Sequence, residues 1–485
     1  MTYSTVVSRD SVRICLTIAA LNDMKVMTAD IQNSYLTAPC REKIWCKAGR
    51  EFESFGIPHG TPLLIVRALY GLKSSGAAFR AFCAEQLDKM NYHSTTGDPD
   101  VWIRPCVDSH GREFYEYMLV YVDDVMSISY KPDKAINQLQ DHGFTLKGGA
   151  AIIPESYVGA ELAFKRLDIH DTNCWTLSTT KYIKHSIDNL EERLTKMNRS
   201  LPNQKQCSTP IVQGYKPELD ASQELDANGI TMFQELIGAL RWATEMGRVD
   251  ILYELAVLSS YQASPRQGHL DQALHIYGYL KHKPKITIYL DSTRMPVPPN
   301  VFKDNAHEFK EQYRDAKEMI PHDMPKPRGN AVRITAYVDS DHASNQTTRK
   351  SHTGYIIFIN RAPILWYSKR QNTVETSTFG SEFLAMKTVT EAIIALRAKL
   401  YWFGIPIDGP ADVYADNESM VNCTRDFDTK LNKKHNAICY HYCRQAVAAE
   451  VIRTGKVHTD FNIADPYTKA LSAPKRTTLF YSWTY

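Results

Sequence analysis

Residues 118–128 read MLVYVDDVMSI, two short apolar runs on either side of a pair of aspartates. Runs of this composition favour β-strands, so the polar break between them predicts a hairpin with Asp123 and Asp124 at its tip. Two adjacent carboxylates repel each other, and a structure that keeps them together usually supplies a cation. An ordinary Asp-Asp turn is the alternative, but the apolar strands favour a rigid hairpin that holds both side chains.

A third carboxylate, Asp30, lies 93 residues before Asp123 and directly follows the run MKVMTA at residues 24–29. Carboxylate oxygens are ligands that Mg²⁺ prefers, and two such ions can stabilise the attacking and the leaving oxygen of a phosphoryl transfer. The three carboxylates therefore predict a metal-dependent phosphoryl-transfer site.

Four more acidic residues occur near the expected ends of strands and helices in the last third of the chain. Asp339 ends a predicted strand at 332–338, and Asp416 follows a predicted strand at 413–415. Glu382 lies in the first turns of a long predicted helix that Ser377 or Thr378 can cap. With Asp465 they suggest a second metal site, although each alone also fits a surface turn, a helix start or a solvated loop.

Length and composition predict a multidomain globular protein. The chain has 485 residues, which corresponds to about three domains. Its content of 43% hydrophobic and 23% charged residues argues against disordered and fibrous classes of protein. Residues 291–330 contain six prolines and are predicted to be a linker or an irregular insertion. The net charge of +3 is uninformative, but residues 331–485 hold 19 basic and 14 acidic side chains. No apolar run approaches the roughly 20 residues of a membrane span.

Ten cysteines without a Cys-x-x-Cys pair predict reduced thiols in an intracellular protein. His435, Cys439 and Cys443 are spaced by four and could align as zinc ligands along one helix face. Ordinary helix positions are the favoured interpretation of this spacing.

Several sequence motifs, in the same order along the chain, resemble those of the reverse transcriptase of copia-type LTR retrotransposons. They include DIQNSYL at 30–36, LYGLK at 69–73, DPDVW at 98–102, YVDD at 121–124 and IGALRW at 237–242. The resemblance covers about residues 5–290. It implies an α+β reverse transcriptase palm over residues 1–200 and thumb or connection helices over residues 201–290.

The resemblance also implies residue roles. Asp30, Asp123 and Asp124 would bind two metal ions, and Tyr35 matches the aromatic residue that stacks under the incoming sugar and excludes a 2′ hydroxyl. A tyrosine of the core is the alternative for Tyr35. Lys73 would contact nucleic acid, although the family's Gln, Arg and Trp around it are replaced by Ser74, Ala77 and Phe79.

Only 29 residues precede Asp30, where the family has its fingers subdomain. We therefore expect the fingers to be largely missing and polymerase activity to be weak or absent, because positioning supplies much of the rate of phosphoryl transfer.

The second acidic set resembles the ribonuclease H that follows reverse transcriptase in these elements. RKSHTGY at 349–355, WYSKRQ at 366–371 and KKHNAI at 433–438 support this resemblance, which covers residues 332 to about 472. It implies an α/β ribonuclease H-like domain at 331–485, in which Asp339, Glu382, Asp416 and Asp465 bind two Mg²⁺ ions, with Mn²⁺ as a substitute. Asp341 is the alternative to Asp339. Candidate nucleic-acid contacts are Lys350, Lys369, Arg370, Lys433, Lys434 and His435.

Both resemblances together imply an RNA-directed DNA polymerase and RNA/DNA-hybrid ribonuclease. The expected partners are RNA template, DNA primer, RNA/DNA hybrid, deoxynucleoside triphosphates and other parts of the same polyprotein, with no membrane. A polymerase-inactive remnant that keeps only ribonuclease H activity or nucleic-acid binding is the alternative. A cytoplasmic particle and the nucleus are both compatible with the family.

Overall fold

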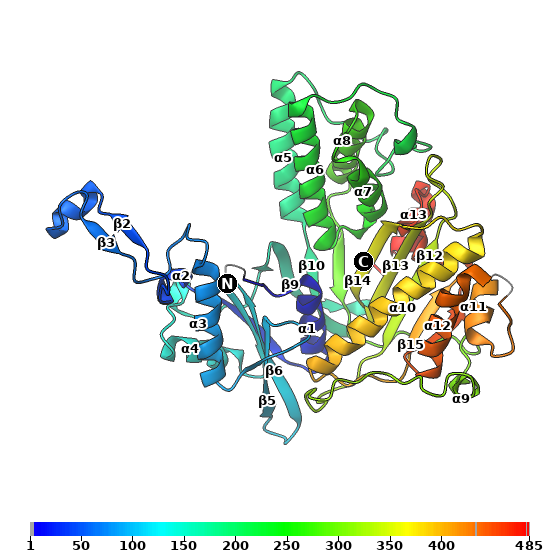
Figure 1. Cartoon of the computed structure of the whole chain (residues 1–485), viewed down its shortest axis with the longest axis horizontal. Helices are drawn as coiled ribbons and strands as arrows, with labels where there is room; N and C mark the ends of the chain where they lie inside the picture. Colours follow the sequence, from blue (N-terminus) through cyan, green and yellow to red (C-terminus); the bar gives the residue numbers. More distant parts are fainter. Residues whose placement is uncertain (1–3, 432–433, 482, 485) are drawn as a thin grey trace. The chain divides into compact units, whose positions relative to one another are not determined.

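A computed structural model describes residues 4–431, 434–481 and 483–484 (Figure 1). Contacts within the chain divide it into two units. The first contains residues 1–154, 325–329 and 402–404, and the second contains residues 155–324, 330–401 and 405–485. Residues 155–200, which the sequence assigns to the palm, make their contacts in the second unit. The two units follow from contacts within the chain, whereas the four domains follow from family resemblance. The domain boundaries therefore remain predictions.

The first unit is built on an antiparallel sheet with the order β1-β7-β6-β5-β4. β6 (Glu113–Tyr121) and β7 (Asp124–Ser129) form the predicted hairpin, with Tyr121 opposite Asp124. Val122, at the turn, has a φ of 56°, in the left-handed region. β1 (Lys25–Asp30) pairs with the other edge of β7, so that Asp30 lies opposite Asp124.

Helices cover this sheet with apolar side chains. Phe79 and Leu87 of α3 (Ser75–Lys89) share a buried cluster with Ile136 of α4 (Pro132–Asp141). The apolar spacing over residues 79–90 predicts a helix, and α3 confirms it. The remaining elements of the first unit are α1 (Arg9–Leu21), α2 (Ser34–Thr37), β2 (Trp45–Lys47), β3 (Pro62–Leu64), β4 (His93–Ser94) and β5 (Val101–Val107).

The second unit begins with a sheet of order β11-β10-β9-β8 and a group of helices. The apolar spacing over residues 233–261 predicts continuous helix, but the structure breaks it between α6 (Ala227–Glu245) and α7 (Leu252–Leu258). Gly247 at the break has a φ of 127°, which an L side chain rarely adopts. The other elements are β8 (Ser156–Tyr157), β9 (Ala160–Leu167), β10 (Thr172–Ser178), α5 (Thr180–Lys196), α8 (Gln267–His282) and β11 (Thr287–Leu290).

The rest of the second unit contains a mixed sheet of order β14-β13-β12-β15-β16. β12 (Ile334–Ser340), β13 (His352–Ile359) and β14 (Ala362–Arg370) are antiparallel, whereas β15 (Ala411–Ala415) pairs parallel with both β12 and β16 (Ile452–Lys456). β12 and β15 confirm the strands predicted at 332–338 and 413–415. Figure 1 shows α10 (Thr378–Trp402) across this sheet, followed by α11 (Glu418–Arg425), α12 (Ala437–Ala448) and α13 (Ala473–Tyr481).

Part of the proline-rich segment packs as an irregular insertion of the second unit. It contains the short helix α9 (Ala306–Lys310), whose Phe309 is fully buried against Phe427, with ring centroids 5.7 Å apart. Glu318 accepts two hydrogen bonds, of 2.6 and 2.8 Å, from the guanidinium of Arg397 on α10. The two predicted alternatives for this segment are a linker and an irregular insertion, and these contacts favour the insertion. No helix in the described part of the chain is long and apolar enough to span a membrane.

Candidate metal centre

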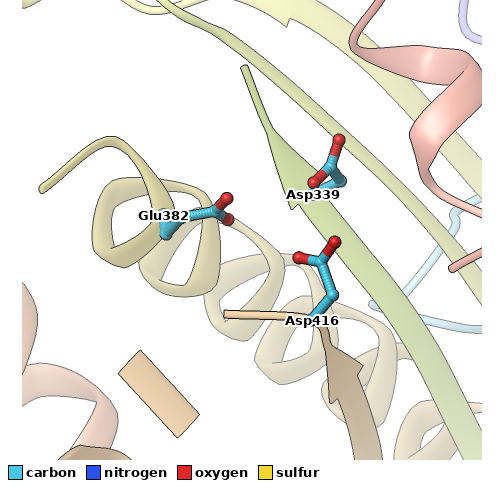
Figure 2. Close-up of side chains that lie close together, drawn as sticks. All are labelled: Asp339, Glu382 and Asp416. Carbon is cyan, nitrogen blue, oxygen red and sulfur yellow. The ribbon is translucent and has the colours of Figure 1, made fainter. Parts of the chain in front are cut away.

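Three of the predicted carboxylates converge at one edge of the mixed sheet (Figure 2). Asp339 lies near the end of β12, Asp416 directly follows β15, and Glu382 lies in the first turns of α10. β12 and β15 are parallel neighbours, so their carboxyl ends meet at the same edge. One oxygen of each side chain lies within 4.8 Å of the others. The order of elements, rather than proximity in sequence, thus brings together three carboxylates that could hold a metal ion.

Burial makes the charged form of this cluster costly. Asp339 is 2% exposed and Glu382 is 4% exposed. Burial raises the pKa of Glu382 well above its usual range, and the charges of Asp339 and Asp416 raise it further. Burial likewise raises the pKa of Asp339, against the opposing effect of Lys469. A divalent cation would offset the cost of burying these charges.

The donor set fits a hard divalent cation such as Mg²⁺ or Mn²⁺. All three side chains offer carboxylate oxygens, which are the ligands these ions prefer. The Oε2 atom of Glu382 is buried and makes no hydrogen bond to any described residue. An orphaned buried carboxylate oxygen is costly unless a ligand completes it.

Asp465 lies beside this cluster and is held by two lysines. It is fully buried, with Lys469 Nζ 3.0 Å from its Oδ1 and Lys475 Nζ 2.8 Å from its Oδ2. Lys469 also lies 3.6 Å from Asp339 Oδ2, which accepts a hydrogen bond from the hydroxyl of Thr468. Asp465 is not one of the three carboxylates within 4.8 Å of one another, and Lys469 links it to them.

Sequence reasoning assigned no role to Lys469 or Lys475. Lys469 stands four residues after Asp465, a spacing that places the two side chains together on a helical turn, so a signal for it was present. Lys475 lies on α13, for which the sequence pattern gave no prediction.

A cavity of about 400 Å³ adjoins Lys469 in the second unit. The predicted contacts Lys350 and Arg370 line it, and so does Lys216, which sequence reasoning missed. Asp341, the predicted alternative to Asp339, lines this cavity instead of joining the three carboxylates. Its other lining residues include Tyr215, Glu218, Tyr253, Tyr261, Ser344 and His352. Cations and aromatic rings in one cavity suit a phosphodiester chain.

The other predicted nucleic-acid contacts lie elsewhere. Lys369 is exposed on β14, and Lys434 and His435 are exposed before α12. His435 Nε2 lies 4.0 Å from Glu375 Oε2. Lys433 lies outside the described residues. His435 does not form a metal-ligand cluster with Cys439 and Cys443 in the described structure, which favours ordinary helix positions for the two cysteines.

The first unit brings its three predicted carboxylates near one another at the hairpin. Asp124 is half-buried, and burial raises its pKa, with Asp123 and then Asp30 adding to the effect. Lys147 Nζ lies 3.3 Å from Asp30 Oδ2, a contact that the sequence did not predict. Among the described residues these three do not form a cluster with oxygens within 4.8 Å of one another.

The two remaining candidates of the first unit differ in exposure. Tyr35 is half-buried, and its ring packs at 4.8 Å from that of Tyr70 and 6.1 Å from that of Phe79. Lys73 is exposed. A stacking role for Tyr35 and a nucleic-acid contact by Lys73 stay predictions.

Comparison with known proteins finds one matching family and several relatives. Residues 1–212 match the family described as reverse transcriptase (RNA-dependent DNA polymerase). The chain is 24% identical over 473 residues to the retrovirus-related Pol polyprotein from transposon RE1 of Arabidopsis thaliana, covering 97% of this chain and 28% of that protein. It is 24% identical to the retrovirus-related Pol polyprotein from transposon TNT 1-94 of Nicotiana tabacum, covering 98% of this chain and 32% of that protein.

The chain therefore spans less than a third of the length of these two relatives. Among solved structures, ribonuclease H1 from Halobacterium salinarum matches 28% of this chain and 94% of its own chain. The identity is 13% and the TM-score is 0.23.

Proposed function

We propose that this chain, a homologue of the retrovirus-related Pol polyproteins of transposons over most of its length, is a reverse transcriptase with ribonuclease H activity. Its second unit would cleave the RNA strand of RNA/DNA hybrids. Its first unit would carry the RNA-directed DNA polymerase site. Hybrid, RNA template, DNA primer and deoxynucleoside triphosphates would be its ligands.

The observation that carries the nuclease proposal is the convergence of Asp339, Glu382 and Asp416, with one Glu382 oxygen left unpaired. These residues would hold Mg²⁺ or Mn²⁺, with Asp465 beside them. When bound, such ions supply positive charge at the scissile phosphate and an activated water. The chain's own contribution is to hold the carboxylates at a buried sheet edge, where they need no rearrangement before binding.

The side chains around the cavity would bind the substrate. Lys216, Lys350 and Arg370 line it, so each could contact a phosphate bound there. Phosphate contacts position a nucleic acid without selecting its sequence. A nuclease that acts on every hybrid would need this kind of contact.

The polymerase proposal rests on the family match over residues 1–212 and on the register that sets Asp30 opposite Asp124. Two observations favour the alternative, a chain that keeps only the nuclease. Lys147 forms an ion pair with Asp30, and the three carboxylates of the first unit do not form a compact cluster among the described residues. Tyr35 and Lys73 would serve the nucleotide and the template in the polymerase case.

Asp416→Asn tests the nuclease site. We expect magnesium-dependent cleavage of a labelled RNA/DNA hybrid by the wild type and a loss of at least about a hundredfold in the variant, because one ligand charge is removed from a metal centre. Asp408→Asn is the matched control, since Asp408 is paired with Arg294 at the surface. Primer extension, where present, should be equal in both variants. Full hybrid cleavage by Asp416→Asn would refute the assignment.

A further inference from the structure

The last helix among the described residues, α13, is anchored to helices that precede it by more than two hundred residues. Arg476 of α13 is 4% exposed and donates a hydrogen bond of 2.8 Å to Glu254 Oε1 on α7. It also donates to the carbonyl oxygen of Asp250. Its guanidinium lies over the rings of Phe480 and Tyr279, at 5.4 and 5.9 Å from their centroids. α13 and α7 are thus joined within the second unit.

This anchor consists of charges that are almost entirely buried. Arg248 donates two hydrogen bonds of 2.9 Å to the two carboxylate oxygens of Asp250, and both residues are at most 2% exposed. Glu254 is 1% exposed, and its second oxygen has no hydrogen-bond partner among the described residues. Arg476 is therefore the cation that compensates Glu254. Removing one partner of such a buried pair leaves an uncompensated charge.

The residue beside this anchor contacts the candidate metal centre. Lys475 Nζ lies 2.8 Å from Oδ2 of Asp465, while Lys469 lies 3.0 Å from Oδ1. The Asp465 carboxylate is thus held from both sides. Lys469 is close to Asp465 in sequence and moves with it, whereas the position of Lys475 depends on where α13 is fixed.

We propose that Arg476 is a positioning residue of the nuclease centre. By its bonds to Glu254 and to the carbonyl of Asp250, it fixes Lys475 against Asp465 and so orients that carboxylate beside Asp339. The inference rests on the proposed ribonuclease H function. It extends that function, because η5 (Val249–Ile251) and α7 then help to position a side chain of the nuclease centre.

The expected consequence is weaker cation binding when this chain of contacts is broken. Hydrogen-bond partners of metal-binding carboxylates typically contribute about 10–100-fold to metal affinity or activity. We expect Lys475→Met and Arg476→Gln each to weaken Mn²⁺ binding about tenfold. The KM for hybrid should change little, because neither side chain lines the cation-rich cavity.

The experiment uses the full chain with Asp124→Asn, so that the first unit contributes less to the metal signal. Mn²⁺ binding without substrate is measured by electron paramagnetic resonance, and the Mg²⁺ concentration for half-maximal hybrid cleavage is measured in parallel. Because Arg476 acts through Lys475, the double variant should bind Mn²⁺ within about twofold of Lys475→Met alone. Arg476→Lys, which keeps the positive charge, should retain much of the wild-type affinity for Mn²⁺.

Arg397→Gln is the matched control, because it breaks another buried arginine pair of the second unit, with Glu318. It should lower thermal stability while leaving Mn²⁺ affinity unchanged. Should Arg476→Gln fail to fold, Glu254→Gln and Arg476→Lys provide milder disruptions, with an expected weakening of Mn²⁺ binding smaller than that of Lys475→Met.

Three results would overturn the inference. These are additive effects of Lys475→Met and Arg476→Gln, an equal effect of Arg397→Gln, and tighter Mn²⁺ binding by Lys475→Met, which would mean that Lys475 competes with the cation. If the wild type cleaves hybrids while these variants bind Mn²⁺ normally, the inference alone fails. If the wild type neither binds Mn²⁺ nor cleaves, the proposed function itself fails.

Discussion

At the scale of single residues, His352 links the stability of the second unit to pH. Its ring is 5% exposed, lies 2.7 Å from Ser368 Oγ through Nε2, and packs edge-on at 5.2 Å from Tyr253. Burial lowers the pKa of His352 to about 3, and Arg370 lowers it further. An unfolded histidine has a pKa of about 6.5. Between these values the unfolded chain binds the extra proton, so the free energy of unfolding falls as pH decreases from 6.5 toward 3.

We expect His352→Gln to flatten this dependence. A single proton changes the free energy of unfolding by about 1.4 kcal/mol per pH unit well below 6.5, and the variant should lack that contribution between pH 6 and pH 4.5. Urea unfolding of the second unit at several pH values measures it. His342→Gln, a change at an exposed position, should keep the wild-type slope. An unchanged slope in His352→Gln would contradict the assignment.

At the scale of elements, the loop at 211–218 and the segment at 341–352 share the cation-rich cavity. Each phosphate contact releases counterions, so its loss should reduce the slope of log affinity against log salt by about 1. We expect Lys216→Ala and Lys350→Ala each to do so for an RNA/DNA hybrid. Fluorescence anisotropy in an Asp416→Asn background, which prevents cleavage, measures the slopes. Lys184→Ala, a change at an exposed position on α5, should keep the wild-type slope. If Lys216→Ala and Lys350→Ala also keep the wild-type slope, this cavity is not the hybrid site.

Elements also show how far the sequence could predict this protein. Strands β12, β13 and β15 and helix α10 follow from apolar periodicity, and the acids at their ends follow with them. The break at Gly247 does not, because the apolar spacing continues through it. Lys475 could not be predicted either. Its place depends on the pairing of Arg476 with Glu254, 222 residues away, which no local pattern encodes.

At the scale of the whole molecule, the second unit starts at residue 155 and is larger than the segment that resembles ribonuclease H, residues 332–472. Trp366 of β14 donates a hydrogen bond of 3.0 Å to the carbonyl of Thr244 on α6, and Arg476 pairs with Glu254 on α7. A fragment of residues 331–485 would lose both partners. The same deletion removes the Tyr279 ring under the Arg476 guanidinium, so the fragment loses both the ion pair and the packing that hold α13.

We therefore expect residues 331–485 to unfold at a clearly lower temperature than residues 155–485, and to bind Mn²⁺ more weakly. Fragment 155–485 should cleave hybrids and should carry no primer extension, because Asp30, Asp123 and Asp124 lie in the first unit. Thermal unfolding followed by circular dichroism, with hybrid cleavage at matched concentrations, distinguishes the two fragments. Equal stability and equal cleavage by both fragments would show that the nuclease is complete without α6 and α7.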